Sequence, residues 1–251
     1  MMFGKLGKLP ARNDPRTLKL ANYLQPGSLP LIPQQVTWGN KVPEWPMFLN
    51  DTLGDCTCAA AGHLIQMWTA DHHHEITPTD DDILQAYEAV GHYDPSDSST
   101  DQGAVEIDVL NYWRQTGIAD HQILAYVSVN PRNKSHLLAA MFLFGGLYIG
   151  VQLPLSAQAQ VGGLWTTTGG DASQTDPGTW GGHAIPLVIH NQSTWSCVTW
   201  GKLQKMDDGF VYTYVDEVYA LVSEDWANKH VGAPSGFDLG HLMKDLKLVT
   251  N

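Results

Sequence analysis

The sequence predicts an α+β fold, with a helical first half and an antiparallel β second half. Directly after Gly54-Asp55, apolar residues recur at the three-and-four spacing of one helical face, at Leu64, Ile65, Met67 and Trp68. Later segments, such as 123–129, alternate apolar and polar residues as strands do. We therefore expect a single domain with a helical half at about 33–120, a β half at about 121–226 and a tail at 227–251.

The composition is that of a globular protein. Of the 251 residues, 43% are hydrophobic and only 16% are charged, which is enough apolar material for a sizeable core. The net charge of −12 disfavours nucleic acid as a partner. The first eight residues lack the apolar stretch of a signal peptide. The longest apolar run, 137–151, is broken by Gly145-Gly146 and is shorter than a membrane helix requires. We expect no membrane partner and a cytoplasmic location.

Three cysteines are present, Cys56, Cys58 and Cys197, and three cannot all pair with one another. A disulfide framework is therefore not expected, and a reducing compartment or a reactive thiol is favoured. Cys56 falls in the first turn of the predicted helix, where free backbone N–H groups and the helix dipole favour the thiolate, which is the nucleophilic form. Asn50, six positions earlier, carries an amide that can donate to an oxyanion.

A candidate base follows the long polar segment 156–182, which has no hydrophobic period and is predicted to be a loop. His183 enters an apolar strand directly after Gly181 and Gly182, and paired glycines let another backbone or a ligand approach closely. Such a histidine is most often structural, but with Cys56 it becomes the natural proton carrier.

The remaining elements are predicted from local signals. Thr79 caps a short helix whose first turn is acidic, and Gly117 ends a helix over 105–116. Gly145-Gly146 ends a helix over 137–144, and Trp200-Gly201 forms a turn between strands. Besides 123–129, strands are predicted at 147–153, 183–189, 194–199, 210–215 and 218–222.

Three adjacent histidines, His72, His73 and His74, do not predict a metal site, because neighbouring residues of a helix point in different directions. No metal and no cofactor are expected. The first 32 residues form a basic extended arm with Lys5, Lys8, Arg12, Arg16 and Lys19 against Asp14. This arm is either a solvated strap over the surface or a docking segment for an acidic assembly partner.

The order of these parts resembles the papain-like cysteine peptidase superfamily, in particular its bacterial and phage members, from about residue 33 to 226. The segment 32–38 resembles the start of the mature papain fold. Asn50 stands where that family has its oxyanion glutamine, and Gly181-Gly182-His183-Ala184 resembles its histidine motif. Trp200-Gly201 stands where the family has Asn-Ser-Trp-Gly, and the helix-Gly-Gly-strand of 137–153 resembles the segment that precedes the histidine.

The resemblance implies a thiol peptidase or amidase that acts on a peptide or amide substrate through a thioester. Cys56 would be the nucleophile, His183 the proton carrier, and Asn50 with the Cys56 N–H the oxyanion donors. Cys56 is favoured over Cys58 because the position six before Cys58 is Thr52, which has no amide. The implied substrate-binding residues are Gly54, Asp55, Gly181, Gly182 and Trp200.

Two positions depart from the family pattern. In place of the asparagine that orients the histidine, the chain offers Thr199 or Val198, with Asn191 and Gln192 as alternatives from a neighbouring turn. Asn50 is one methylene shorter than glutamine. No inhibitory pro-region is expected, since an arm of about thirty residues is too short to fold as its own domain. These departures support an alternative function: a catalytically weak or inactive papain-like scaffold that is a structural or binding component, such as one of a phage virion. If the protein is phage-encoded, the expected location is the virion instead of the cytoplasm.

Overall fold

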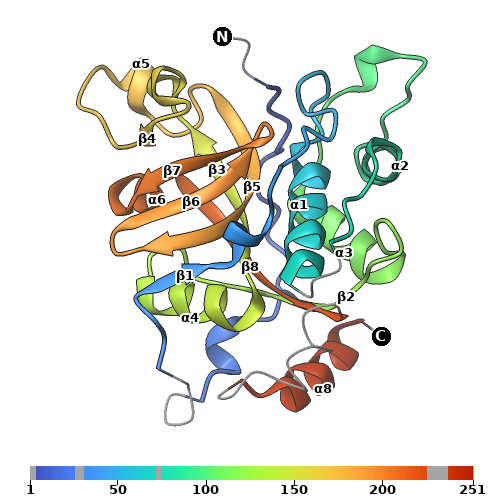
Figure 1. The fold of residues 1–251 in the computed structure, drawn as a ribbon. Coiled ribbons are helices and arrows are strands. Elements are labelled where there is room, and N and C mark those ends of the chain that lie inside the picture. Colours follow the sequence, from blue (N-terminus) through green and yellow to red (C-terminus); the bar gives the residue numbers. More distant parts are fainter. Residues whose placement is uncertain (1–3, 26–30, 72–74, 225–236, 251) are drawn as a thin grey trace.

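The computed structural model describes residues 4–25, 31–71, 75–224 and 237–250. Figure 1 shows an α+β arrangement in which the helices of the first half lie on one side of the molecule and most of the strands lie on the other. The first-half helices are α1 (Cys56–Asp71), α2 (Asp80–Gly91) and α3 (Glu106–Gln115). The predicted fold class is therefore confirmed.

One sheet organises the second half. Its strands run in the order β2-β8-β3-β5-β6-β7-β4, and β1 pairs with β5 outside this path. All described pairings are antiparallel except that of β4 with β7. The strands are β1 (Gln35–Thr37), β2 (Ile123–Ser128), β3 (Leu147–Leu153), β4 (Leu164–Trp165), β5 (Gly181–Asn191), β6 (Thr194–Thr199), β7 (Lys202–Asp207) and β8 (Val215–Ser223).

Helix α1 is buried along its whole length, which explains why it carries apolar or small residues on every face. It packs against β5, so that the start of the helix and the start of the strand are brought together. At Gly62 a Cβ atom would lie 2.7 Å from Ile83 and 2.9 Å from Phe48, so only glycine permits this packing distance. Gly62 thus packs α1 against Ile83 of α2 and against Phe48, while the contact of α1 with β5 places Cys56.

The local signals located several elements correctly. The Thr79 hydroxyl accepts from the Asp82 N–H, and the Asp82 carboxylate accepts from the Thr79 N–H, which forms a capping box at the start of α2. Helix α4 (Lys134–Phe144) ends at Gly145, which adopts a left-handed conformation with φ of 66°. Strand β3 has the predicted bounds, 147–153.

The strand predicted at 210–215 is wrong. Residues Asp208–Tyr214 form the short helix α6, and the Asp207 side chain caps it by accepting from the Phe210 N–H at 2.7 Å. The buried residues Phe210, Val211 and Tyr214 follow helical spacing, which in so short a run is indistinguishable from a strand pattern. The preceding strand, β7, was not predicted because its residues are mostly polar or charged.

Residues 156–182, predicted to be a loop, contain short pieces of structure, namely η5 (Leu155–Gln160), β4 and α5 (Ala172–Thr175). The predicted tail contains helix α8 (Leu239–Thr250), whereas its start at Asp225-Trp226 lies outside the described residues. The other short helical turns are η1 (Leu20–Asn22), η3 (Trp38–Lys41) and η4 (Ser98–Thr100). Within the described ranges, the helices do not combine the length and hydropathy needed to cross a bilayer.

Candidate active site

Cys56 is the first residue of α1 and is buried. The N–H groups of Cys58 and Ala59 both donate to the Asp55 carbonyl, so the helix starts directly at the cysteine. The Ala184 N–H of β5 donates to the Cys56 sulfur at 3.4 Å. Residues 128 apart in the sequence thus meet through the packing of α1 on β5.

His183 is held by Thr199. The Nε2 atom of the imidazole lies 2.7 Å from the Thr199 hydroxyl, and the Trp200 indole stacks on the ring with centroids 4.9 Å apart. Asn191 cannot orient the His183 ring, because it lies eight residues along the same strand, about 26 Å away at the usual strand rise. Gln192 follows Asn191 directly and is no nearer by this estimate. Of the residues predicted as possible partners of His183, Thr199 is the one whose side chain contacts the imidazole.

Cys56 and His183 line one small cavity of about 10 Å³, together with Asn50, Thr199 and Trp200. This volume is about that of a single water molecule. The second ring nitrogen of His183, Nδ1, is buried and has no hydrogen-bond partner among the described residues. One imidazole nitrogen is therefore fixed by Thr199 and the other is available for proton exchange.

The Asn50 amide is already engaged. Its Nδ2 donates to the Leu53 carbonyl at 3.1 Å and to the Asp55 carboxyl at 3.1 Å, and an amide has only two N–H donors. Burial raises the pKa of Asp55 well above its usual range. In this state Asn50 holds the turn before Cys56, and an oxyanion would have to replace one of these two acceptors.

We compared the chain with known proteins. No family model and no curated protein matches it. Among solved structures, it is similar to xylellain, a cysteine protease from Xylella fastidiosa, with 14% identity over 87% of this chain and 96% of that one and a TM-score of 0.68. It is also similar to a procathepsin B of Trypanosoma congolense, with 11% identity over 88% and 87% of the two chains and a TM-score of 0.60.

A digestive procathepsin L of Tenebrio molitor larval midgut superposes with a TM-score of 0.57 at 12% identity, over 88% of this chain and 76% of that one. All three are papain-like cysteine proteases. The chain has a papain-like fold. The resemblance inferred from its motifs is confirmed at the level of the fold, and identities this low show no more than that.

The chain's own N-terminal arm lies over the space between α1 and the start of β5, where Cys56 and His183 lie and which we call the cleft. Figure 1 shows the arm, in dark blue, running between the sheet and α1. The Lys5 N–H donates to the Asn50 carbonyl at 2.7 Å, and the Lys8 N–H donates to the Gly182 carbonyl at 3.1 Å. The Ala104 N–H donates to the Gly7 carbonyl at 2.8 Å. Residues 4–8 are thus held from both sides of the cleft.

The arm contacts four of the five residues that were predicted to bind substrate. A Cβ atom on Gly54 would lie 3.2 Å from the Leu6 carbonyl, one on Gly181 would lie 2.9 Å from the Leu6 side chain, and one on Gly182 would lie 2.3 Å from the Lys8 carbonyl. The Trp200 indole donates to the Lys5 carbonyl at 3.3 Å. The backbone that approaches Gly181 and Gly182 closely is therefore that of the chain's own arm.

This arrangement corrects one expectation about the arm, that it is a solvated strap. Residues 9–13 are exposed, as a solvated strap would be, but residues 4–8 cover the sulfur. The expectation that no inhibitory pro-region is present stays a prediction. Several arm cations pair with acids of the same chain: Lys8 with Asp216 and Glu217, Arg12 with Asp108, and Arg16 with Asp14. The assembly partner stays a prediction.

Burial sets the protonation of the pair. It raises the pKa of the Cys56 thiol to about 12, since the N–H groups of Ala184 and Gly7 only partly offset the loss of water. Burial likewise lowers the pKa of His183 to about 3. The helix start was expected to favour the thiolate. In the covered state desolvation outweighs that effect, and both groups are neutral at pH 7.

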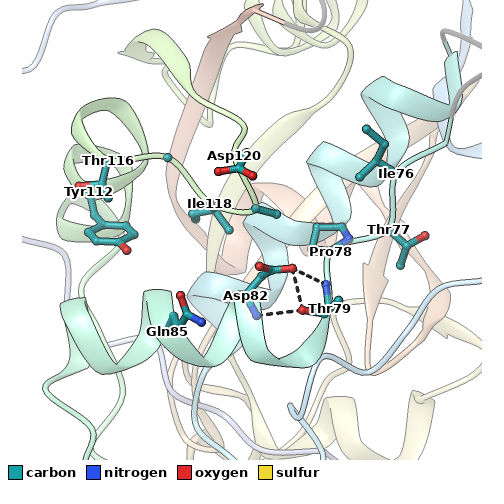
Figure 2. Close-up of a pocket in the computed structure, with 12 residues that line it drawn as sticks. Ile76, Thr77, Pro78, Thr79, Asp82, Gln85, Tyr112, Thr116, Ile118 and Asp120 are labelled. Carbon is teal, nitrogen blue, oxygen red and sulfur yellow. Dashed lines mark hydrogen bonds between the residues drawn. The ribbon is translucent and has the colours of Figure 1, made fainter.

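A larger cavity of about 430 Å³ lies apart from this site, between the start of α2 and the segment after α3 (Figure 2). The described residues that line it include no cysteine or histidine, and the Asp82 carboxylate on its wall is used in the capping box. In the described part of the chain, no group of three metal-binding side chains is arranged around a common point. His72, His73 and His74 lie outside the described residues.

Sequence reasoning missed Gly7 and Lys8 as residues of the cleft, and it missed Glu106 and Glu217, the acids around Lys8. One signal was available: Gly4-Lys5-Leu6 is repeated as Gly7-Lys8-Leu9. Glycine at every third position of an arm is unexpected for a solvated strap, but it suits a chain that must lie close to another backbone. The acids gave no local signal, because they come from α3 and β8.

Proposed function

We propose that the protein is a thiol hydrolase, a peptidase or amidase, whose reacting groups are Cys56 and His183. The observation that carries this proposal is the state of the imidazole. Its Nε2 is fixed by Thr199, while its Nδ1 is buried without a partner in the small cavity that it shares with the Cys56 sulfur. Buried imidazole nitrogens are usually hydrogen-bonded, and the unpaired one here belongs to a ring that lines the same cavity as the sulfur.

The reaction is acyl transfer in two steps. Cys56 gives its proton to His183 Nδ1, and the sulfur attacks the substrate carbonyl carbon to form the C–S bond. The C–N bond then breaks as His183 protonates the leaving amine, which yields a thioester. Water adds to the thioester with His183 as base, which releases the acid and restores the thiol. The Cys56 N–H and the Asn50 amide donate hydrogen bonds to the oxyanion once one Asn50 N–H has left its present acceptor.

The peptide would bind where the arm now lies. The carbonyl of Gly182 and both backbone groups of Ala104 already bind the arm as they would bind an extended substrate chain. Thr199 keeps His183 oriented, and Trp200 covers the imidazole from solvent. The covered state is latent, and turnover requires that the arm leave the cleft.

A second candidate function is that of a papain-like scaffold without activity, for example a component of a phage particle. The observation that favours it is the engagement of both Asn50 donors, which leaves the oxyanion with the Cys56 N–H alone in the covered state. In that case the arm would be a permanent part of the fold. Its glycines and its buried lysine would then serve packing only.

A thiol-reactive probe distinguishes the two candidates. The purified protein is treated with a peptidyl vinyl sulfone, with and without a mild destabiliser of the arm such as 1 M urea, and labelled sites are identified by mass spectrometry. The hydrolase proposal predicts selective labelling of Cys56 that is lost in His183→Ala. Equal labelling of the parent and of His183→Ala, or copurification in fixed stoichiometry within a large assembly, would favour the scaffold.

A further inference from the structure

The ammonium of Lys8 is enclosed. Its side chain has 0% exposure, with Nζ at 3.0 Å from Asp216 and 2.9 Å from Glu217. Lysine is almost never fully buried unless it is paired. A Cβ atom on Gly150 would lie 2.1 Å from Lys8 Cε, so the aliphatic stem lies directly against the β3 backbone. The arm has thus inserted one long cationic side chain into a fitted pocket.

The pocket gathers more carboxyl groups than Lys8 pairs with directly. Glu106, at the start of α3, has 0% exposure, and both of its carboxylate oxygens lack a hydrogen-bond partner among the described residues. Burial acts to lower the pKa of Lys8, yet Glu106, Glu217 and Asp216 together raise it above its ordinary value. Burial raises the pKa of Glu106 well above its ordinary value, and the nearby Lys8 ammonium opposes that rise. Carboxyl groups buried in this way are costly to ionise unless a cation is present.

The pocket belongs to the cleft. Lys8 follows Gly7, whose N–H faces the Cys56 sulfur, and its own N–H donates to Gly182, the residue before His183. Its neighbour Leu9 donates to the Ala104 carbonyl at 3.0 Å. Any extended chain held by Gly182 and Ala104 therefore presents a side chain to Glu106 and Glu217 within one or two residues of the reacting sulfur.

We propose that this acidic pocket, formed by Glu106, Asp216 and Glu217, selects a lysine or arginine side chain of the substrate when the arm leaves. The inference rests on the proposed hydrolase function and names its substrate class as basic peptides. Lys8 is the intramolecular occupant that keeps the carboxylates paired until such a substrate replaces it. Asp216 lies nearest to solvent and also accepts from Gln152 at 2.7 Å, so it forms the entrance.

A binding test does not depend on catalysis. In full-length Lys8→Ala, n-propylammonium supplies the three carbons and the ammonium that the substitution removes. We expect millimolar n-propylammonium to raise the melting temperature of this variant by several degrees, whereas n-propanol and sodium chloride do not. Lys5→Ala, which removes a half-exposed arm lysine, is the matched control and should not respond. An equal rise in melting temperature in both variants, or an equal rise with sodium chloride, would contradict the proposed acidic pocket.

A second pair of variants keeps the proposal testable if Lys8→Ala does not fold. Lys8→Met retains most of the stem without the charge, and Lys8→Arg retains the charge. We expect alkylation of Cys56 to become at least about tenfold faster in Lys8→Met, because the arm loses a charged contact, and to stay close to the parent rate in Lys8→Arg. Parent-like alkylation of Lys8→Met would contradict an acidic pocket that holds the arm.

Turnover then tests the substrate class. In Lys8→Ala, peptide pairs that differ only by lysine or norleucine at each position near the cleaved bond are compared by kcat/KM. At one position lysine should be preferred by about tenfold or more, and Glu217→Gln should reduce that ratio. Cleavage without a basic preference would overturn the pocket alone. Binding of n-propylammonium with no cleavage of any peptide would instead overturn the hydrolase function.

Discussion

The backbone N–H of Gly7 faces the sulfur of Cys56. The arm therefore offers the sulfur a hydrogen-bond donor at this residue, and the Gly7 carbonyl is turned away to accept from Ala104. A thiol attacks a carbonyl carbon, and an N–H group is not an electrophile. At Gly7 the arm therefore presents a peptide nitrogen, and not the Gly7 carbonyl carbon, to the nucleophile.

The first prediction concerns the release of the arm. A Cβ atom on Gly7 would lie 1.7 Å from the Gly54 carbonyl oxygen, so Gly7→Val must displace the arm. Because the pKa of the covered thiol is about 12, exposure should raise the alkylation rate of Cys56 by iodoacetamide at pH 8 by about 100-fold or more. Mass spectrometry of the labelled protein measures this rate.

Gly169→Val is the matched control, since a Cβ atom at Gly169 meets nothing within 4 Å. It should be alkylated at the parent rate. If Gly7→Val melts as cooperatively as the parent but its cysteine is no more reactive, the arm does not limit access to the sulfur, and the covered state is not the cause of latency.

The second prediction concerns pH. With a folded pKa of about 3 for His183, lowered from 6.5 by burial, the unfolded chain binds this proton more tightly than the folded one. The stability contributed by the neutral imidazole is fully present above pH 6.5 and is lost as the pH falls toward 3. His63, with a pKa lowered by burial to about 4, acts in the same direction.

Urea unfolding at pH 7 and at pH 5 measures this loss. The difference in unfolding free energy between the two pH values should be smaller in His183→Gln than in the parent, because the variant has one proton fewer to take up on unfolding. The same pH dependence in both proteins would show that His183 is not buried in the neutral form.

How much of this site follows from the sequence alone can be judged from particular residues. Cys56 and His183 were identified because a helix start and a Gly-Gly-His strand entry are local patterns, and the order of motifs placed both in a papain-like fold. Thr199 was one of several alternatives, because sequence spacing does not say which side chain of a strand reaches a ring on its neighbour. Strand β7 was missed because most of its residues are polar or charged, and helix α6 was missed because so short a run has weak periodicity.

The arm and the acidic pocket were beyond the reach of local patterns for another reason. The acids that surround Lys8 come from Glu106, 98 positions later, and from Asp216 and Glu217, more than 200 positions later. Each acid alone is unremarkable in an acidic chain. Only the folded contact reveals that Lys8, one of the five cations of the arm, pairs with carboxylates of the same molecule.

The third prediction separates the two cysteines of the helix start. Cys58 is buried deeper in α1, and burial raises its pKa well above the usual value. In the Gly7→Val background, Cys56→Ser should abolish probe labelling and hydrolysis, whereas Cys58→Ala should retain both and lose stability by about 1 kcal/mol for the small cavity. Retained labelling in Cys56→Ser would make Cys58 the reactive thiol.

The fourth prediction concerns Thr199. In the Gly7→Val background, Thr199→Val removes the hydroxyl on His183 Nε2 while keeping the shape, so the imidazole loses its fixed orientation. We expect kcat to fall by about tenfold or more with little change in KM, because the substrate groove is untouched. Thr199→Ser keeps a hydroxyl and should restore most of the activity. A merely structural threonine would lower the melting temperature equally in both variants, with kcat unchanged in each. A kcat for Thr199→Val equal to that of the Gly7→Val parent would therefore exclude an orienting role for this hydroxyl.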